Sequence, residues 1–203
     1  MLENNKVSIV GTICEKLEFE HEAYGEAFFK SKVKVKRLSG AEDVLPISIP
    51  ERLLFSGEQY IIGSRVKIDG QFRSMNKLTS TGSKLILFVF VRDICLTDEE
   101  VDANECDLTG YLCKPVQYRT TPFEREVSDL LIAVNRQYNR SDYIPAIAWG
   151  RNARFAESLE IGQGVKVHGR IQSRTYQKKW PNGLVEDRIA YEVSISLLEV
   201  VHA

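Results

Sequence analysis

One short stretch of the chain, AVNRQYNRSDYIPAIAWG (residues 133–150), combines large aromatic side chains with cationic ones. The aromatic residues of the stretch are Tyr138, Tyr143 and Trp149. Its cationic residues are Arg136 and Arg140, and Arg151 follows directly after the stretch. The stretch is extended in character, so these side chains would project from neighbouring strands. A planar ring held on a strand offers a stacking surface to an unpaired base, and a guanidinium neutralises a phosphate. The pattern suggests contact with a single nucleic-acid strand.

A second set of candidates follows near the C-terminus: Arg170, Arg174, Tyr176, Lys178, Lys179 and Trp180. The last three belong to QKKWPNG (177–183), whose Pro-Asn-Gly predicts the tip of a hairpin. Such a tip would extend the wall of a binding groove. The alternative for every aromatic candidate is burial in a core, and Trp149, beside two alternating alanines, is the one most prone to it.

The overall charge excludes a polycationic binder. The chain has 203 residues, with 27 Lys and Arg against 28 Asp and Glu and a formal net charge of −1. Binding of nucleic acid must therefore come from cations gathered on one face. We find no pattern typical of a signal peptide or a membrane span, and we expect a cytoplasmic, nucleoid-associated protein.

No group of residues has the spacing of a catalytic or metal site. The four cysteines (Cys14, Cys95, Cys106 and Cys113) form no CxxC pair, and the three histidines are scattered. We expect reduced, mostly buried thiols, no metal and no cofactor. Paired carboxylates and nucleophile motifs are not evident either, so we expect no enzyme activity.

The chain repeats itself at a shift of 99 positions. Between residues 5 and 77, fifteen identities fall in register without a gap. They include Asn5 with Asn104, Gly11 with Gly110, Cys14 with Cys113, Val35 with Val134, Arg37 with Arg136, Asp43 with Asp142, Pro46 with Pro145 and Ser74 with Ser173. The chain is therefore two copies of one unit. We place the units at 1–97 and 106–203, with an acidic linker at 98–105.

Each unit reads as mostly strand. Val and Ile alternate with polar residues, most clearly in KVKVKR and VKVHGRI. The first unit has predicted strands at 7–19, 28–37, 44–49, 65–74 and 85–94, and a short helix within 50–62. This layout is that of the OB-fold, a small barrel that binds oligonucleotides on one face. We predict an all-β chain of two tandem five-stranded OB-fold barrels with one short helix per unit, whose strands bend at Gly70 and Gly169.

The second unit resembles the bacterial single-stranded DNA-binding proteins. The resemblance lies in LLIAVNRQY, DYIPAIAWG, IGQGVKVHGRIQSRTY and YEVSI, which cover most of residues 104–201. It implies sequence-independent binding of single-stranded DNA in replication, recombination or repair. It places the stacking side chains at Tyr138, Tyr143, Trp149 and Tyr176, to which the hairpin tip adds Trp180. The candidates for phosphate contact are Arg136, Arg140, Arg151, Arg170, Arg174, Lys178 and Lys179.

The first unit resembles the family more weakly, through NKVSIVG, GSRVKIDGQFRS and FVFVRDI. Its residues at the four stacking positions are not aromatic: Ser39, Val44, Pro50 and Lys77. We therefore expect it to be structural or dimerising. Lysines at 30, 32, 34 and 36 lie on one side of a predicted strand and could contact phosphates. We favour a solvated outer face instead, because the second unit has no lysine at the matching positions. The acidic run 15–26 is expected to be a solvated loop.

The resemblance also bears on partners. Members commonly assemble four OB-folds, so two per chain imply a homodimer. They usually continue into an acidic recruiting tail, whereas this sequence stops at LLEVVHA, and no such tail is expected. RNA stays open as a ligand because stacking alone does not read the sugar. The alternative function is a primosome-type or scaffold protein that uses OB-folds mainly to bind other proteins.

Overall fold

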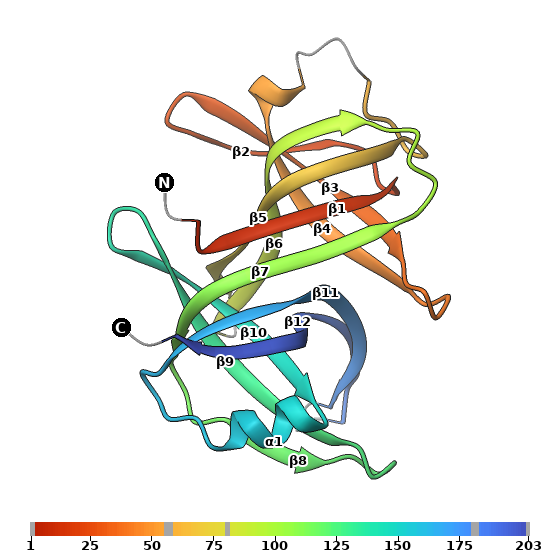
Figure 1. The fold of residues 1–203 in the computed structure, drawn as a ribbon. Coiled ribbons are helices and arrows are strands. Elements are labelled where there is room, and N and C mark those ends of the chain that lie inside the picture. The colour runs from red at the N-terminus through yellow and green to blue at the C-terminus, as the bar shows by residue number, and fades with distance from the viewer. Residues whose placement is uncertain (1–2, 55–58, 80–81, 180–182, 202–203) are drawn as a thin grey trace.

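The computed structural model describes residues 3–54, 59–79, 82–179 and 183–201. Within these ranges one continuous 12-stranded sheet winds around two barrels, one above the other in Figure 1. The first unit contains β1 (Asn5–Ile13), β2 (Glu18–Ala23), β3 (Glu26–Lys36), β4 (Glu42–Pro50), the 3₁₀ turn η1 (Glu51–Leu53), β5 (Arg65–Thr79) and β6 (Gly82–Leu96). The second contains β7 (Ala103–Leu112), β8 (Gln117–Thr120), β9 (Glu126–Arg136), β10 (Arg140–Trp149), α1 (Arg151–Glu157), β11 (Gly164–Lys179) and β12 (Val185–Val201).

Each barrel closes through the same two contacts. In the first unit β1 pairs with β3, and β4 runs parallel to β6. In the second unit β7 pairs with β9, and β10 runs parallel to β12. The predicted all-β chain of two barrels is confirmed. Its linker is shorter than predicted, since β7 begins at Ala103, inside the range 98–105.

The structure corrects the predicted strand boundaries in the first hairpin of the first unit. The predicted strand 7–19 divides into β1 and β2, because residues 14–17 leave the sheet. Residues 18–23 were predicted as part of an acidic loop, but they form β2 and pair with β3. Their side chains are almost all exposed, so the prediction of a solvated segment holds even though the loop does not.

The two predicted helices differ in length. Helix α1 of the second unit spans Arg151–Glu157, whereas the first unit forms the single turn η1 directly after Pro50. Residues 55–58 of the predicted helix 50–62 lie outside the described ranges. The following Tyr60 is buried, and its hydroxyl donates to the carbonyl of Ile94 at 3.0 Å.

Both predicted bends lie at register shifts of the sheet. The pairing of β5 with β6 shifts between Asp69 and Gly70, and that of β11 with β12 shifts between His168 and Gly169. A Cβ atom on Gly169 would lie 2.2 Å from the carbonyl oxygen of Ser194. The strands cross too closely there for any side chain, which is why a bulge in a coiled strand selects glycine.

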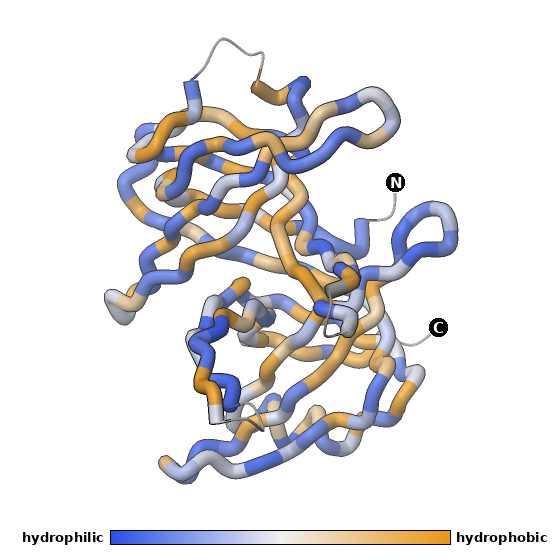
Figure 2. The backbone as a smooth tube through the Cα atoms, turned by 180° about the vertical axis from the view of Figure 1, so that it is seen from behind, coloured by the Kyte–Doolittle hydropathy of each residue, from blue (hydrophilic) through white to orange (hydrophobic). Residues whose placement is uncertain are grey.

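Alternating apolar residues fill both barrels. Val33 and Val35 on β3, and Ile132 and Val134 on β9, are buried and alternate with more exposed neighbours. Figure 2 shows hydrophobic and hydrophilic residues alternating along the strands of both units. Of the four thiols only that of Cys106 is buried, so the prediction of mostly buried cysteines is wrong.

Among the described residues, no helix is long and apolar enough to cross a membrane. In the same part of the chain, no three His, Cys, Asp or Glu side chains come together as a metal site would require.

Strands β1 and β7 join the two barrels, and we call this antiparallel contact the seam. Its register sets Val7 opposite Cys106, two residues that are 99 positions apart. The repeat in the sequence therefore corresponds to an approximate twofold axis that passes between these residues and relates one unit to the other.

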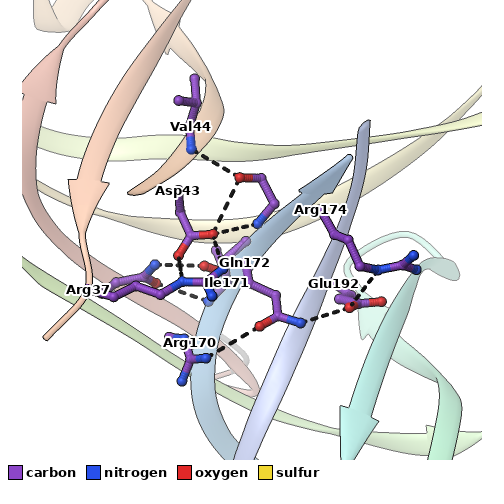
Figure 3. Close-up of polar contacts among 10 residues, drawn as sticks. Arg37, Asp43, Val44, Arg170, Ile171, Gln172, Arg174 and Glu192 are labelled. Carbon is purple, nitrogen blue, oxygen red and sulfur yellow. Dashed lines mark hydrogen bonds and ion pairs between the residues drawn. The ribbon is translucent and has the colours of Figure 1, made fainter. Parts of the chain in front are cut away.

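Two buried aspartates fasten each barrel to the other across the seam. Asp43 of the first unit accepts a hydrogen bond from the backbone N–H of Ser173 at 2.7 Å, and Asp142 of the second unit accepts one from that of Ser74 at 2.8 Å. Each serine hydroxyl in turn accepts from the N–H of the residue after the aspartate, at 3.2 and 2.7 Å (Figure 3 shows the first). The repeat has thus kept the residues that hold its two copies together.

The two aspartates are not equally satisfied. Arg37 donates to both oxygens of Asp43, at 2.7 and 2.6 Å. Arg136 approaches Asp142 with one nitrogen at 3.4 Å, and the other carboxylate oxygen of Asp142 is buried without a hydrogen-bond partner among the described residues. Burial raises the pKa of Asp142, against the opposing effect of the Ser74 N–H and the nearby guanidiniums.

Candidate nucleic-acid interface

Three of the predicted stacking residues lie on one side of the second barrel. Tyr143 and Trp149 share a side of β10 because six residues separate them in a strand. Strand β12 lies between β10 and β11, and its register with both places Tyr176 on the same side. We call this surface, formed by Tyr143, Trp149 and Tyr176, the stacking face.

The rings of the stacking face are partly open to solvent. Tyr143, Trp149 and Tyr176 are 42%, 39% and 37% exposed, whereas the residues between them on β10 that face inward are buried. The alternative of burial in a core therefore does not hold for these rings, Trp149 included. Half-buried apolar residues (Leu131, Ala133 and Pro145) and the buried Ile147 lie on the same side, so the rings rise from an apolar floor.

One arginine is held beside a ring of this face. The guanidinium carbon of Arg174 lies 5.8 Å from the ring centroid of Tyr176, within reach of a cation–π contact. Its Nε lies 3.7 Å from the carboxylate of Glu192, which also accepts from the side-chain amide of Gln172 at 2.8 Å (Figure 3). These contacts orient Arg174 across the face and balance the charge of the buried Glu192.

The remaining basic candidates are divided between several places. Arg140 begins β10, Arg151 begins α1 and Lys179 ends β11, and all three are exposed. Lys178 follows Tyr176 by two residues on β11 and therefore lies on the same side of the strand. Trp180 lies outside the described residues.

Two predicted phosphate contacts, Arg136 and Arg170, lie between the two units instead. Arg136 is paired with Asp142, as described above. Arg170 donates to the side-chain oxygen of Gln172 at 3.4 Å, and its Nε is buried without a partner among the described residues (Figure 3). Burial, and then the charge of Arg37, lower the pKa of Arg170. A role of Arg170 on the stacking face is therefore not favoured by its surroundings.

Tyr138, the fourth stacking candidate, stands apart from the other three. It lies at the tip of the β9–β10 hairpin, 91% exposed and with a positive φ of 62°. Together with Arg136 and Arg140 it lines a cavity of about 660 Å³ where the two units meet.

The first unit also lines that cavity, and its aromatic and cationic residues there are Tyr24, Arg73 and Arg92. The sequence reasoning missed them because it looked for aromatic residues only at the positions matched by the repeat. A signal was present at Arg73. The matching position of the second unit holds the uncharged Gln172, so this cation is particular to the first unit.

Comparison with known proteins relates the second unit to one family. Residues 103–201 match the model of the single-strand binding protein family. The single-stranded DNA-binding protein of Clostridium tetani is 32% identical over 83 residues, covering 37% of this chain and 57% of that protein. Single-stranded DNA-binding protein 1 of Streptococcus pyogenes is 30% identical, covering 37% and 64%. The chain thus spans less than two thirds of the length of these curated relatives.

Solved structures show the likeness in fold over the whole chain. The wild-type single-stranded DNA-binding protein from Thermus aquaticus has a TM-score of 0.79 at 20% identity, covering 98% of this chain and 93% of that one. The N-terminal domain of the PriB protein from Thermoanaerobacter tencongensis, described as dimeric, is 50% identical over 48% of this chain and all of that one, with a TM-score of 0.43. The first match agrees with two OB-fold barrels in one chain.

Proposed function

Since residues 103–201 match the model of the single-strand binding protein family, we propose that the chain belongs to this family and binds single-stranded DNA without sequence preference. It would do so in replication, recombination or repair, as a cytoplasmic, nucleoid-associated protein that acts by binding and not by catalysis. The observation that carries the proposal is the stacking face, on which Tyr143, Trp149 and Tyr176 are all partly exposed.

Stacking on this face needs only the flat surface of a base. Because every base has such a surface, the contact tolerates any sequence, and each stacked base contributes about 1–3 kcal/mol. The apolar floor beneath Tyr143 supports the same contact, since it is covered when a base replaces water. Duplex DNA hides its base faces, so the stacking face would select single strands.

The sugar-phosphate backbone would follow the cations around this face. Arg174 and Lys178 share the side of Tyr176, and Arg151 is exposed at the start of α1, two residues after the end of β10. Charge–phosphate contacts release counterions from the strand, which makes affinity fall as the salt concentration rises.

Titration with oligo-dT tests the function directly. We expect the fluorescence of Trp149 to be quenched as the strand binds, and the logarithm of the binding constant to fall linearly with the logarithm of the salt concentration. The slope for single strands is about −0.7 for each neutralised phosphate. Fluorescence that no single strand changes would contradict DNA binding and favour the protein-binding scaffold.

We further propose that two chains assemble into a homodimer with four barrels. The support is the presence of two barrels in each chain, set against the four-barrel assemblies that the resemblance implies. Light scattering at micromolar concentration is expected to give twice the chain mass of 23.1 kDa. A mass equal to one chain would contradict the dimer.

A further inference from the structure

The cavity between the two units has strongly cationic walls, and we call it the basic cavity. Its arginines are Arg73 and Arg92 from the first unit and Arg136 and Arg140 from the second. Asp142 is the acidic residue of the lining, and one of its oxygens is bonded to the backbone N–H of Ser74. Four guanidiniums around one carboxylate attract an anion.

Arg73 is held in this wall, and no carboxylate among the described residues forms an ion pair with it. Its Nε and Nη2 donate to the amide oxygen of Gln71, at 3.2 and 2.7 Å, and its guanidinium carbon lies 3.7 Å from the ring centroid of Phe90. Burial first, and then the charges of Arg136 and Arg92, lower the pKa of Arg73 to about 10. The charge of Arg73 is therefore incompletely balanced, and an anion in the cavity would stabilise it.

The approximate twofold axis supplies an internal comparison. The matching cavity, of about 520 Å³, is lined by three carboxylates and three cations: Asp43, Asp102, Glu105, Lys36, Arg37 and Arg170. Because it holds three carboxylates against the one of the basic cavity, we call it the acidic cavity. There Arg37 is fully engaged with Asp43, whereas Arg136 in the basic cavity makes a single contact of 3.4 Å. Of these two matching arginines, Arg136 therefore keeps more of its donors for a ligand.

Two tyrosines stand at hairpin tips around the basic cavity. Tyr24 lies between β2 and β3 and Tyr138 between β9 and β10, and the two hairpins reach the same side of the molecule in Figure 1. They are 100% and 91% exposed, with positive φ angles of 52° and 62°. A left-handed backbone is unfavourable for tyrosine, and a ring this exposed gains no packing in return. Both features suit residues kept for contact with a ligand.

We propose that the basic cavity holds one nucleotide of the bound strand, its phosphate among the four arginines and neighbouring bases on Tyr138 and Tyr24. The inference rests on the proposed function and gives the first unit a direct part in binding. The acidic cavity, where Ser39 stands at the position of Tyr138, has no such part.

The double variant R92Q/R140Q tests this site, because both side chains are exposed and their loss leaves the core intact. Removal of two phosphate contacts is expected to reduce the magnitude of the salt slope for oligo-dT by about 1.4 and to lower affinity at moderate salt roughly tenfold or more. The charge-matched control K34Q/K36Q changes β3, where Lys36 lines the acidic cavity. It is expected to keep the wild-type slope.

A second variant, Y24A, tests the aromatic part, since Tyr24 has a role only if the strand enters the basic cavity. Its affinity for oligo-dT is expected to fall about tenfold. Wild-type binding with an unchanged slope in R92Q/R140Q and unchanged affinity in Y24A would overturn the site while leaving the proposed function intact. A wild-type protein that binds no oligo-dT would overturn the function itself, and the site with it.

Discussion

Replacement of Tyr138, Tyr143 and Tyr176 by alanine is expected to weaken binding of oligo-dT by at least about 3 kcal/mol, or more than about 100-fold. Each ring supplies one stacking surface, so the three losses are expected to add. Anisotropy of a labelled oligo-dT measures the loss directly. The triple variant keeps Trp149, so the fluorescence quenching that remains reports whether the strand still reaches the stacking face.

The control for this prediction is the set of four lysines on β3: Lys30, Lys32, Lys34 and Lys36, each changed to glutamine. Three of them are already paired with glutamates, at 3.2, 2.8 and 3.3 Å. Because these charges are partly neutralised within the protein, their removal is expected to cost far less affinity than loss of the tyrosines. A larger loss from the lysine variant would overturn the assignment of base contacts to the second unit.

The second large effect is expected from Asp43→Asn, which breaks the fastening between the barrels. Asp43 is buried and accepts from both Arg37 and the backbone N–H of Ser173. The substitution leaves the guanidinium of Arg37 without its counter-charge, and removal of one partner of a buried pair costs about 3–5 kcal/mol. Urea unfolding of the wild type and the variant measures the difference in the free energy of unfolding.

Asp142→Asn is the matched control across the approximate twofold axis. Its cost is expected to be smaller, because Asp142 makes one weak contact with Arg136 and leaves an oxygen unbonded. An equal or larger cost than that of Asp43→Asn would contradict the unequal satisfaction of the two sites.

The effect of Asp142→Asn on the free energy of unfolding is expected to depend on pH. The pKa of Asp142 is raised above its ordinary value of 3.8 in the folded protein, so the folded state binds the proton more tightly than the unfolded state. Between 3.8 and the raised pKa, the contribution of Asp142 to the free energy of unfolding therefore decreases as pH rises, and above the raised pKa it is constant. The difference between the wild type and Asp142→Asn, measured by urea unfolding from acidic to neutral pH, should follow this course.

Much of the fold could be predicted because its signals are local. Alternation in KVKVKR fixed which side of β3 is buried, and Gly70 and Gly169 marked the bends. The helix within 50–62 was overestimated, since its apolar residues are shared between η1 and the core position of Tyr60. The split of the first strand into β1 and β2 depends on the way β3 pairs with both, which no local pattern contains.

The site could be predicted only in part. The exposed rings of Tyr143, Trp149 and Tyr176 follow from strand positions, and all three lie where alternation places them. Tyr24 and Arg73 could not be found in this way, because only the pairing of β1 with β7 brings them near Tyr138. The repeat shows that both units have aspartate at the matching positions 43 and 142. The reason is that each aspartate contacts the other unit, which the sequence does not reveal.

The unequal cavities have a consequence for the direction of a bound strand. A nucleic-acid strand has a 5′ and a 3′ end, and a binder with true twofold symmetry offers it two equivalent routes that run in opposite senses. Here one cavity sets four guanidiniums against one carboxylate, whereas the other sets three cations against three carboxylates. Fusion of the two copies into one chain allowed them to diverge, and a strand held in the basic cavity as proposed would cross the protein with a single polarity.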